Sequence, residues 1–600
     1  MTSPKPLRLW PGVVAAVVLC VLRYAVPLVF SDAFVVGFLG AVVCAVAILV
    51  WWVFFSRAPW FERIGALVVI VVAFLVTKPL LHKSIATGMM GLMYPIYALP
   101  PVVAPVLVAW AALTRNFSDG VRRATMVVAM FLACGVWLFF RTDGIIGSGS
   151  QITWRWTPSA EERLLAKGEE TSPEPATKPS VAAAPTSPED GAAAGRNAES
   201  ATVLPSPLPR AARAEWPGFR GPNRDSAIDG VRVNTDWTTS PPVQLWRRQV
   251  GPGWSSFAVT GDVLYTQEQR GESEEVAAYR VSTGRPIWRH RDPVRFWESN
   301  GGAGPRATPT INHNRVYTFG ATGILNALDA DTGARVWSRN VATDAEKTVP
   351  MWGFASSPLV IGDLVVVAAS GRLAAYDAAT GKRRWLGPPR PGSYSSPHLF
   401  TADGVQQILL LSAAGVTSVS PEDGALLWEQ EWDGGGTTIV QPALTGDGDL
   451  LINAIATSGG LGLRRLNVTH GSNGWNVSER WTSTGLKPYF NDFVVHKGHA
   501  FGFDGNILAC IDLSDGHRKW KGGRYGNGQL ILLAAEDLLL VLSEDGELAL
   551  VKATPDQFTE VARFKAIEGK TWNHPVLVRD TLLVRNGEEM AAFKLALDVR

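Results

Sequence analysis

The stretch ALDADTGARVW at residues 327–337 decides the fold of this chain. It begins as a short apolar strand, turns at an Asp-x-x-Thr-Gly segment and ends in a second strand whose last residue is Trp337. Gly at the end of such a turn supplies the positive φ angle that a short hairpin loop needs. The polar side chain at the start of the turn can hydrogen-bond to turn amides. The stretch therefore predicts a β-hairpin, and related stretches occur at residues 278–288 (AYRVSTGRPIW), 375–385 (AYDAATGKRRW), 418–428 (SVSPEDGALLW) and 510–520 (CIDLSDGHRKW).

The spacing of these stretches is the second indication of the fold. Hairpin repeats at a pitch of roughly 40–50 residues are typical of a β-propeller, in which each repeat forms one blade. An aromatic residue at the end of a strand marks each of about eight repeats. These residues are Trp246, Trp288, Trp337, Trp385, Trp428, Trp481, Trp520 and, in a degenerate copy, Phe564.

The two ends of the repeat region are each incomplete. The segment VQLWRRQ (243–249) reads as an outer strand with no inner strands before it, and MAAFKL (590–595) has no outer strand after it. We expect the two segments to share one blade and so to close the ring, because closure removes exposed strand edges. This predicts eight blades, with seven as the alternative.

The repeated tryptophans could either pack between blades or stack on a cofactor. A large aromatic residue at one position of every blade buries apolar area against both neighbours. We therefore expect Trp288, Trp337, Trp385, Trp428 and Trp520 to be packing residues.

The repeats resemble the pyrroloquinoline-quinone (PQQ)-like repeat of quinoprotein dehydrogenases and of the outer-membrane assembly lipoprotein propeller. They are similar in more detail to bacterial PQQ-binding-like β-propeller repeat proteins. The resemblance covers residues 215–600 and implies an all-β, eight-bladed propeller. It is carried by EWPGFRGPNRD (215–225), GGAGPRATPTI (301–311), WGFASSPLVIGD (352–363), SYSSPHLF (393–400) and RYGNGQLIL (524–532), besides the hairpins.

The first 142 residues differ in character from the repeats. The whole chain is 46% hydrophobic with a mean hydropathy of +0.09, because long apolar runs occupy its beginning. Most of these runs are long enough to cross a bilayer as a helix. We expect a helical membrane domain with spans at about residues 9–30, 34–55, 64–81, 89–113 and 124–140; four spans is the alternative if the short third run merges with its neighbour or the first run does not cross.

Basic residues in the loops indicate the orientation of these spans. They gather before the first span, between the second and third, and between the fourth and fifth. An N-terminus in the cytoplasm and an odd number of spans place the propeller in the periplasm of a Gram-negative cell, beside the inner membrane. The residues concerned are Lys5, Arg8, Arg57, Arg63, Arg115, Arg122 and Arg123.

Residues 143–214 are expected to form a linker. Most of this segment is rich in Pro, Ala, Ser, Thr and Glu, a composition that cannot bury a core. A brief juxtamembrane helix is expected near residues 160–170.

Composition excludes several functions. The net charge of +2 and the absence of a basic stretch with interleaved aromatic residues give no case for nucleic acid. The sequence has no C-x-x-C-H motif for an attached haem and no adjacent cysteine pair. His496 and His499 read as turn residues, and no metal site is predicted.

The loops that enter the innermost strands are the best candidate for a binding site. They are rich in aromatic, amide and small residues, and they should form the mouth of the central funnel. Aromatic rings there could stack on a planar quinone and Arg306 could pair with its carboxylates. The alternative is that these residues only pack where strands converge. The candidate binding residues are Trp254, Arg306, Trp352, Tyr394, Asn491, Asn527, Trp572 and Asn573, with Asp492 and His574 as the candidate general bases of an enzyme.

Two functions remain open at this point. The first is a membrane-anchored periplasmic propeller that acts as a binding or assembly scaffold, or as a sensor, with an envelope protein as its partner. The second is a membrane-bound, PQQ- and calcium-dependent sugar or alcohol dehydrogenase that passes electrons to membrane quinone. Short blades and modest insertions favour the scaffold.

Overall fold

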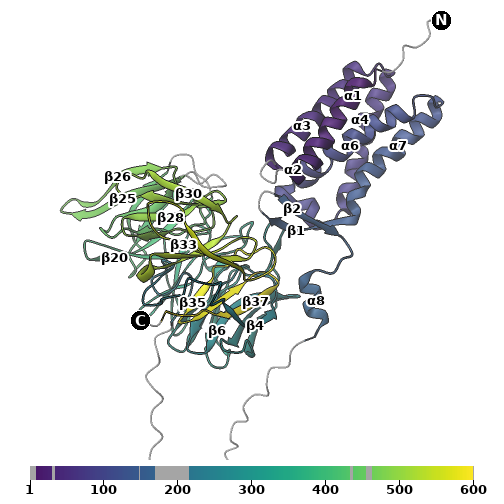
Figure 1. Ribbon diagram of the computed structural model, residues 1–600. Helices are drawn as coiled ribbons and strands as arrows, with labels where there is room; N and C mark the ends of the chain where they lie inside the picture. Colours follow the sequence, from purple (N-terminus) through teal and green to yellow (C-terminus); the bar gives the residue numbers. More distant parts are fainter. Residues whose placement is uncertain are drawn as a thin grey trace, which may run out of the picture. The chain divides into compact units, whose positions relative to one another are not determined.

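The computed structural model describes residues 8–29, 34–146, 149–168, 215–432, 437–454 and 462–598 (Figure 1). The chain divides into two compact units. The first comprises Met1–Arg163 and Arg295–Gly304, and the second comprises Leu164–Val294 and Pro305–Arg600. Helices dominate the first unit and strands the second.

The first unit contains five helical segments that are long and apolar enough to cross a membrane: Trp10–Val29, Val36–Phe55, Trp60–Leu80, Met93–Leu113 and Asp119–Phe139. This agrees with five predicted spans rather than four. The α-helices within them are α1 (Trp10–Cys20), α2 (Val26–Val29), α3 (Phe34–Val50), α4 (Trp60–Thr77), α6 (Pro100–Leu113) and α7 (Asp119–Gly135), and the short α5 (Lys83–Thr87) lies between α4 and α6.

The fourth span is irregular where its sequence is rich in proline. Met93–Ala98 is π-helical, and α6 then begins with Pro100 and contains Pro105. Proline lacks the N–H that an α-helical hydrogen bond requires, so a regular helix through this segment is disfavoured. The span is therefore irregular before Pro100, and α6 continues through Pro105.

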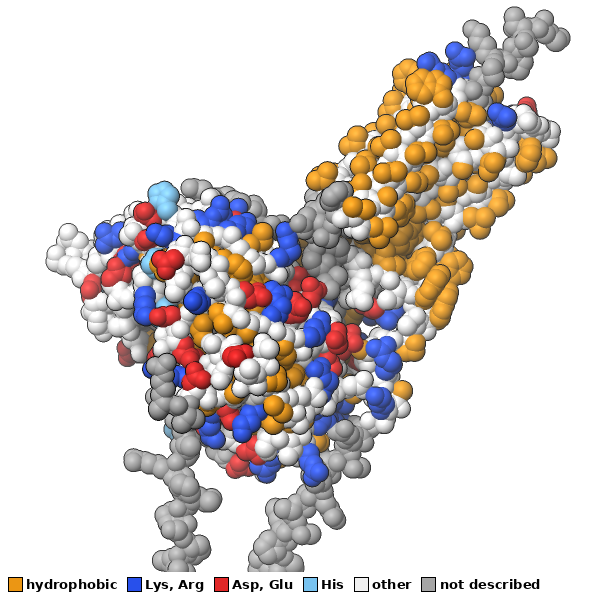
Figure 2. Space-filling model, in the orientation of Figure 1, with side chains coloured by type: hydrophobic (Ala, Val, Ile, Leu, Met, Phe, Trp, Pro, Cys, Tyr) orange, Lys and Arg blue, Asp and Glu red, His pale blue; other side chains and the backbone are white. Residues whose placement is uncertain are grey.

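The helices carry apolar side chains on their outer surface. Val43, Leu75 and Leu132 are each more than half exposed, and hydrophobic side chains cover most of the helical unit in Figure 2. So large an exposed apolar surface is typical of a protein that contacts lipid.

One buried ion pair lies inside the helical unit. The third span begins at Trp60, earlier than the sequence indicated, so Glu62 falls in the first turn of α4. Its carboxylate lies 3.2 Å from the guanidinium of Arg122 in α7, and both side chains are buried. A buried charge needs such a partner, so the pair ties α4 to α7.

Part of the predicted linker is ordered. Two paired antiparallel strands, β1 (Phe140–Ile146) and β2 (Gly149–Trp154), are followed by α8 (Ala160–Ala166). Aromatic rings stack along this strand pair, with 4.7 Å between the ring centres of Phe140 and Trp154. The expected short helix is therefore present. Residues 143–168 differ from the linker assignment because these aromatics and the Ser159–Glu162 capping box stabilise local structure; residues 169–214 lie outside the described residues.

The second unit is a ring of eight four-stranded antiparallel blades, as the repeats predict. The first four blades are β5 (Ala258–Thr260), β6 (Val263–Arg270), β7 (Ser273–Arg280) and β8 (Pro286–Asp292); β11 (Thr310–Asn312), β12 (Arg315–Phe319), β13 (Ile324–Asp329) and β14 (Arg335–Asn340); β15 (Leu359–Ile361), β16 (Leu364–Ala368), β17 (Leu373–Asp377) and β18 (Arg383–Leu386); and β19 (His398–Ala402), β20 (Val405–Ser412), β21 (Gly415–Val419) and β22 (Leu426–Glu431). A one-turn helix, α9 (Val341–Asp344), follows β14.

The other four blades complete the ring. They are β23 (Ala443–Leu444), β24 (Leu450–Ala454), β25 (Gly462–Gly471) and β26 (Gly474–Ser483); β27 (Val494–His496), β28 (His499–Asp504), β29 (Ile507–Asp512) and β30 (Arg518–Arg524); β31 (Gln529–Leu533), β32 (Leu538–Leu542), β33 (Glu547–Lys552) and β34 (Glu560–Lys565); and β35 (Val576–Val578), β36 (Thr581–Arg585) and β37 (Glu589–Lys594) with β4 (Val243–Gln249). The seventh blade gains a fifth strand, β3 (Ala227–Ile228). The hairpin of β9 (Trp297–Glu298) and β10 (Gly302–Ala303) belongs to the first unit.

The last blade closes the ring as expected. Its outer strand is β4, from the start of the repeat region, and β4 pairs antiparallel with β37 from the C-terminal end. Trp246 of β4 lies opposite Ala592. Because strands from the start and the end of the repeat region form this blade together, the first and last repeats stabilise each other.

The repeated tryptophans pack between blades, which confirms the structural interpretation. The indole N–H of Trp288 donates to the carbonyl of Ala330 in the next blade at 2.9 Å, and Trp337 donates to Ala378 at 2.9 Å. Beneath each ring lies the turn glycine of the next blade: a Cβ on Gly333 would lie 2.4 Å from a ring carbon of Trp288. Gly333 also has a φ angle of +70°. The Gly of the repeat thus allows the positive φ angle of its own turn and the close approach of the tryptophan ring of the neighbouring blade. The same pattern recurs at Trp246, Trp385 and Trp481.

Trp428 departs from this pattern. Its indole N–H donates to the side-chain oxygen of Gln407 within its own blade, at 2.6 Å. The next blade has no short Asp-x-x-x-Gly turn at the matching place, because β25 and β26 continue as a long hairpin to a tight turn between Gly471 and Gly474. Trp520 keeps the indole hydrogen bond to the next blade, to the carbonyl of Thr554 at 2.7 Å, but the ring of Phe558 packs against it where the other repeats have a glycine.

Candidate functional site

A series of hydrogen bonds connects six successive blades, the first to the sixth, just before their inner strands. In each step, a backbone N–H of one blade donates to a side-chain oxygen at the equivalent position of the next blade. The steps are Ser256 to Thr308 (3.0 Å), Thr308 to Ser357 (3.0 Å), Ser357 to Ser396 (2.9 Å), Ser396 to Gln441 (3.1 Å) and Gln441 to Asp492 (2.7 Å). The side chains that sequence reading placed at the funnel mouth therefore include members of a structural series of hydrogen bonds.

Asp492 is one of these members. Its carboxyl group is buried, accepts the N–H of Gln441 and lies 3.6 Å from Arg220. Burial raises the pKa of this carboxyl group, and Arg220 together with the N–H of Gln441 opposes the rise. Asp492 is thus held by two protein groups.

His574 is similarly engaged. Its Nε2 lies 2.8 Å from the hydroxyl of Ser226, and its Nδ1 lies 2.7 Å from the carbonyl of Pro575. Nδ1 must carry the proton to donate to that carbonyl, so Nε2 accepts from Ser226. Burial, together with the nearby charge of Arg220, lowers the pKa of His574 to about 3. The ring is therefore neutral at physiological pH.

Both residues contact one segment, residues 215–228, which we call the plug. Its backbone adds to the inner strands: Trp216 forms an antiparallel bridge with Val259, and the carbonyl of Pro217 accepts the N–H of Ile311 at 2.7 Å. Ala227 and Ile228 form β3, which runs parallel to β31. The plug thus contacts blades on several sides of the central channel.

Two buried arginines fix the plug in place. Arg220 donates to Ser226 at 2.8 Å and to the carbonyl of Phe493 at 2.8 Å. Arg224 donates to the carbonyls of Pro358 and Ser357, at 3.0 and 3.2 Å. Both arginines have left-handed φ angles, +62° and +57°, which cost on the order of 1–2 kcal/mol each for a residue with a Cβ. The side-chain hydrogen bonds offset that cost.

The predicted aromatic residues form two groups at the starts of the inner strands. In the first, the rings of Trp254 and Trp572 lie 4.7 Å apart, Phe490 lies 5.0 Å from Trp572, and the ammonium of Lys570 lies 4.6 Å from the Trp572 ring centre. Trp572 donates its indole N–H to Glu544 at 2.7 Å. Asn527 also donates its side-chain amide to Glu544, at 3.1 Å.

The second group is centred on Trp352. Its ring lies 5.0 Å from that of Tyr394, and its carbonyl accepts Nε of Arg306 at 3.2 Å. Trp254, Trp352, Tyr394 and Trp572 are all half-buried. Half-buried aromatic residues with polar atoms beside them are typical of protein-binding surfaces.

The two remaining candidates are structural in their contacts. Asn573 is buried and donates to the carbonyls of Gly253 and Ser255, at 3.2 and 2.6 Å, which joins the last blade to the first. Asn491 is buried, and its side-chain oxygen accepts the N–H of Tyr489 at 3.2 Å.

A buried carboxyl group that the sequence did not single out lies beside Arg306. Glu274 of β7 accepts the N–H of Ala321 at 3.1 Å. Burial, with a smaller contribution from Asp292, raises the pKa of Glu274 to about 7, and Arg306 opposes the rise.

The residues do not fit a quinone with a calcium ion. Calcium requires several converging oxygen ligands, and the part of the chain that the structure describes contains no group of three or more His, Cys, Asp or Glu side chains placed to hold a metal. The carboxylate of Asp492, a candidate general base that could also offer oxygen ligands, is committed to Arg220 and Gln441. No step through PQQ follows from this arrangement.

Sequence reasoning missed the plug arginines. Residues 215–225 supported the family resemblance, yet Arg220 and Arg224 were not named as site residues. The signal available was two arginines in a Gly- and Pro-rich segment directly before the first strand. Their partners, Phe493 and Pro358, lie far away in the sequence.

The closed ring of eight blades with these turns and tryptophans defines the class: a β-propeller of PQQ-like repeats. The family described as outer membrane protein assembly factor BamB matches residues 243–396, 387–529 and 416–597. These matches span more than half of the chain, and the chain belongs to this family.

Individual proteins are similar to this chain over different shares of its length. The chain is 22% identical to the outer membrane protein assembly factor BamB of Moranella endobia over 314 residues, which cover 49% of this chain and 77% of that protein. It is 23% identical to the BamB of Yersinia pestis over 332 residues, 52% of this chain and 70% of that protein. A quinohemoprotein alcohol dehydrogenase of Pseudomonas putida is 30% identical over 152 residues, 23% of this chain and 20% of that enzyme. The crystal structure of BamB from Moraxella catarrhalis aligns with a TM-score of 0.43 at 16% identity, over 60% of this chain and 99% of that one.

Proposed function

We propose that this protein is a membrane-anchored scaffold of the bacterial envelope, whose propeller binds a partner protein in the periplasm. The observation that carries the proposal is the plug. It pairs with inner strands of the ring, and its side chains contact both candidate catalytic residues. With the plug against the inner strands, we expect a partner protein to bind at the rim or the outer faces of the propeller. The relatives named as outer membrane assembly factors support the same role.

The rim aromatics are the proposed contact surface. Trp254 and Trp572 form one half-buried group, and Trp352 and Tyr394 form the other. Tryptophan, tyrosine and arginine are enriched among residues that carry binding energy in protein interfaces. The residues that the sequence marked for a cofactor are thus reassigned to a protein partner.

The five apolar helices are the proposed anchor in the inner membrane. Basic residues on one side of the spans place the N-terminus in the cytoplasm and the propeller in the periplasm. Reporter fusions after Arg115 and after Trp154 test this: a cytoplasmic reporter is expected to be active at the first position and a periplasmic one at the second. The reverse pattern contradicts the orientation.

Photo-crosslinking in cells that produce the full-length chain tests whether the rim binds a partner protein. A photoreactive phenylalanine analogue at Trp254 or Trp352 is expected to capture a defined envelope protein. The same analogue at Val336, an exposed position on an outer strand, serves as the control. Identical products at all three positions contradict a specific rim surface.

The alternative function, a PQQ-dependent dehydrogenase that reduces membrane quinone, is favoured by the local similarity to a quinohemoprotein alcohol dehydrogenase. Titration of the full chain with PQQ and calcium, followed by tryptophan fluorescence and by dye reduction with sugars and alcohols, separates the two. The scaffold predicts neither saturable quenching nor turnover. Saturable binding with turnover supports the enzyme.

A further inference from the structure

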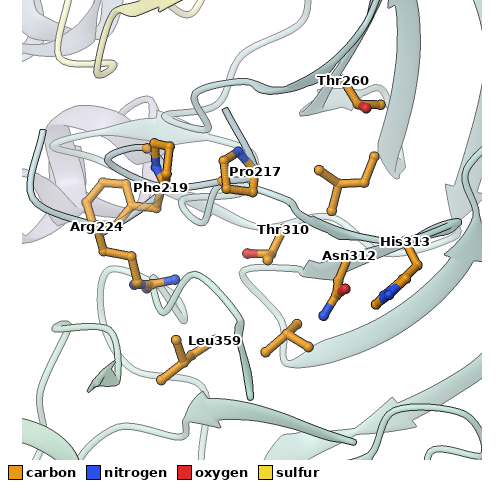
Figure 3. Close-up of a pocket in the computed structure, with 13 residues that line it drawn as sticks. Pro217, Phe219, Arg224, Thr260, Thr310, Asn312, His313 and Leu359 are labelled. Carbon is orange, nitrogen blue, oxygen red and sulfur yellow. The ribbon is translucent and has the colours of Figure 1, made fainter. Parts of the chain in front are cut away.

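A cavity of about 460 Å³ lies between the plug and the inner strands of the first three blades (Figure 3). Its lining is mixed: Phe219, Ile311 and Val360 are apolar, whereas Thr260 and Asn312 offer hydroxyl and amide groups. These residues lie where the inner strands end, away from the rim aromatics that precede the strands. The volume is within the range of small-molecule sites.

Arg224 forms one side of the cavity. Figure 3 shows it on the left, across the cavity from Asn312 and His313. The side chain is 9% exposed, and its charge is balanced by backbone carbonyls of Pro358 and Ser357, not by an acid. Among the described residues, no carboxylate forms an ion pair with it, whereas Arg220 next to it has Asp492.

A buried cation without an anion is unusual, because desolvation of an unpaired charge is costly. A guanidinium has five N–H donors, and the two carbonyl bonds use two of them. Nε is buried without a hydrogen-bond partner in the described structure. Burial and the charge of Arg220 lower the pKa of Arg224 to about 10, so the group still carries its charge at neutral pH. An anion at this end of the cavity would satisfy the guanidinium.

The edges of the inner strands around the cavity already pair with an extended segment, the start of the plug. Trp216 and Val259 exchange backbone hydrogen bonds of 3.2 and 2.7 Å, and Pro217 pairs with Ile311. Addition of an extended segment to a strand edge is a general mode of peptide recognition. The cavity continues past these plug contacts, along Thr260 and Asn312.

We infer that this cavity binds a small apolar carboxylate, such as the C-terminal residue of a peptide, with the carboxylate on Arg224 and the apolar group against Phe219 and Val360. Asn312 and Thr260 hydrogen-bond its remaining polar atoms. The planar guanidinium suits a carboxylate, which can accept two parallel hydrogen bonds from it. This site goes beyond the proposed scaffold function and does not depend on it.

The test is isothermal titration of the full-length protein in lipid nanodiscs. The probes are N-acetyl-Ala-Ala-Leu with a free carboxylate, the same peptide as its amide, N-acetyl-leucine and inorganic phosphate. We expect the free acid to bind at least ten-fold more tightly than the amide. Tighter binding of the tripeptide than of N-acetyl-leucine identifies a peptide terminus, and equal binding identifies a free small carboxylate.

Two variants locate the binding. Arg224→Met removes the cation, and Val360→Trp fills the cavity while leaving Arg224 in place. The matched control is Val405→Trp, at an exposed position of β20. We expect at least ten-fold weaker binding with Val360→Trp and wild-type binding with Val405→Trp, so the result does not depend on the stability of Arg224→Met. Equal binding of acid and amide, phosphate binding as tight as that of the peptide, absence of binding, or binding that survives Val360→Trp would overturn the inference.

Discussion

Two kinds of contact stabilise the ring: the contacts between blades repeat one arrangement, whereas the contacts of the plug each occur once. Between blades, one arrangement recurs: a tryptophan, the glycine turn of the next blade and a carbonyl that accepts the indole N–H. The plug has no repeat, and each of its residues has a different partner. Arg220 reaches Phe493, Arg224 reaches Pro358, and Ser226 reaches His574. The difference indicates that repeated residues define the fold, whereas the single plug segment sets the contacts of Asp492 and His574 beside the inner strands.

The largest effect is expected from breaking the plug's buried charge pair. Arg220→Met leaves the carboxylate of Asp492 buried without its cation, so we expect a loss of about 3–5 kcal/mol in the free energy of unfolding of the propeller. Urea unfolding of the full chain, followed by tryptophan fluorescence, measures it. Adding Asp492→Asn should recover part of the loss, and Arg579→Met, at an exposed pair with Glu215, should cost under about 0.5 kcal/mol. A loss equal to that of Arg579→Met contradicts the structural role of the pair.

The next effect concerns the contact between blades. Gly333→Ala places a Cβ against Trp288 at a positive φ angle, and we expect a cost of about 3 kcal/mol. Gly404→Ala is the matched control, since Gly404 also has a positive φ angle but has open space around its Cβ position; about 1 kcal/mol is expected there. Equal costs at the two sites would mean that the tryptophan contact adds nothing. The same unfolding measurement applies.

A smaller effect should appear in the pH dependence of stability. The pKa of Glu274 is raised from its ordinary value of about 4.5 to about 7 in the folded state, so the folded state binds more protons than the unfolded state between these values. The contribution of Glu274 to stability should therefore fall as pH rises from about 4.5 to about 7, by an amount on the order of 1–3 kcal/mol. Glu274→Gln should flatten this slope relative to the wild type. His574 titrates identically in both proteins, so the difference between them isolates Glu274; parallel slopes would contradict the assignment.

The smallest effect on stability is expected at the rim. Trp254 is half-buried, so Trp254→Phe should cost under about 1 kcal/mol, yet it should weaken capture of the partner if the rim binds protein. Chemical crosslinking in cells, with Val336→Ala as the surface control, measures the capture. Unchanged capture would separate the aromatic group from the proposed function.

The sequence alone determined the parts of the protein that depend on local repetition. The recurring Asp-x-x-Thr-Gly turns and strand-end tryptophans predicted blades, their number and the closure of the ring by residues 243–249, since each turn is specified by residues a few positions apart. Apolar length predicted five helices for the same reason. Trp254, Trp352, Tyr394 and Trp572 lie before the starts of inner strands, where their sequence context places them, and their role in binding stays a prediction.

Only the tertiary structure decided the partners of the polar side chains beside the inner strands. Asp492 and His574 read as free acid–base groups in the sequence, because nothing near them indicates a partner. Their partners, Arg220 and Ser226, lie 272 and 348 residues away. Those contacts form only when ring closure brings the plug and the inner strands together. Burial then changes both pKa values, and the chemistry of each residue is set by contacts that no local pattern encodes.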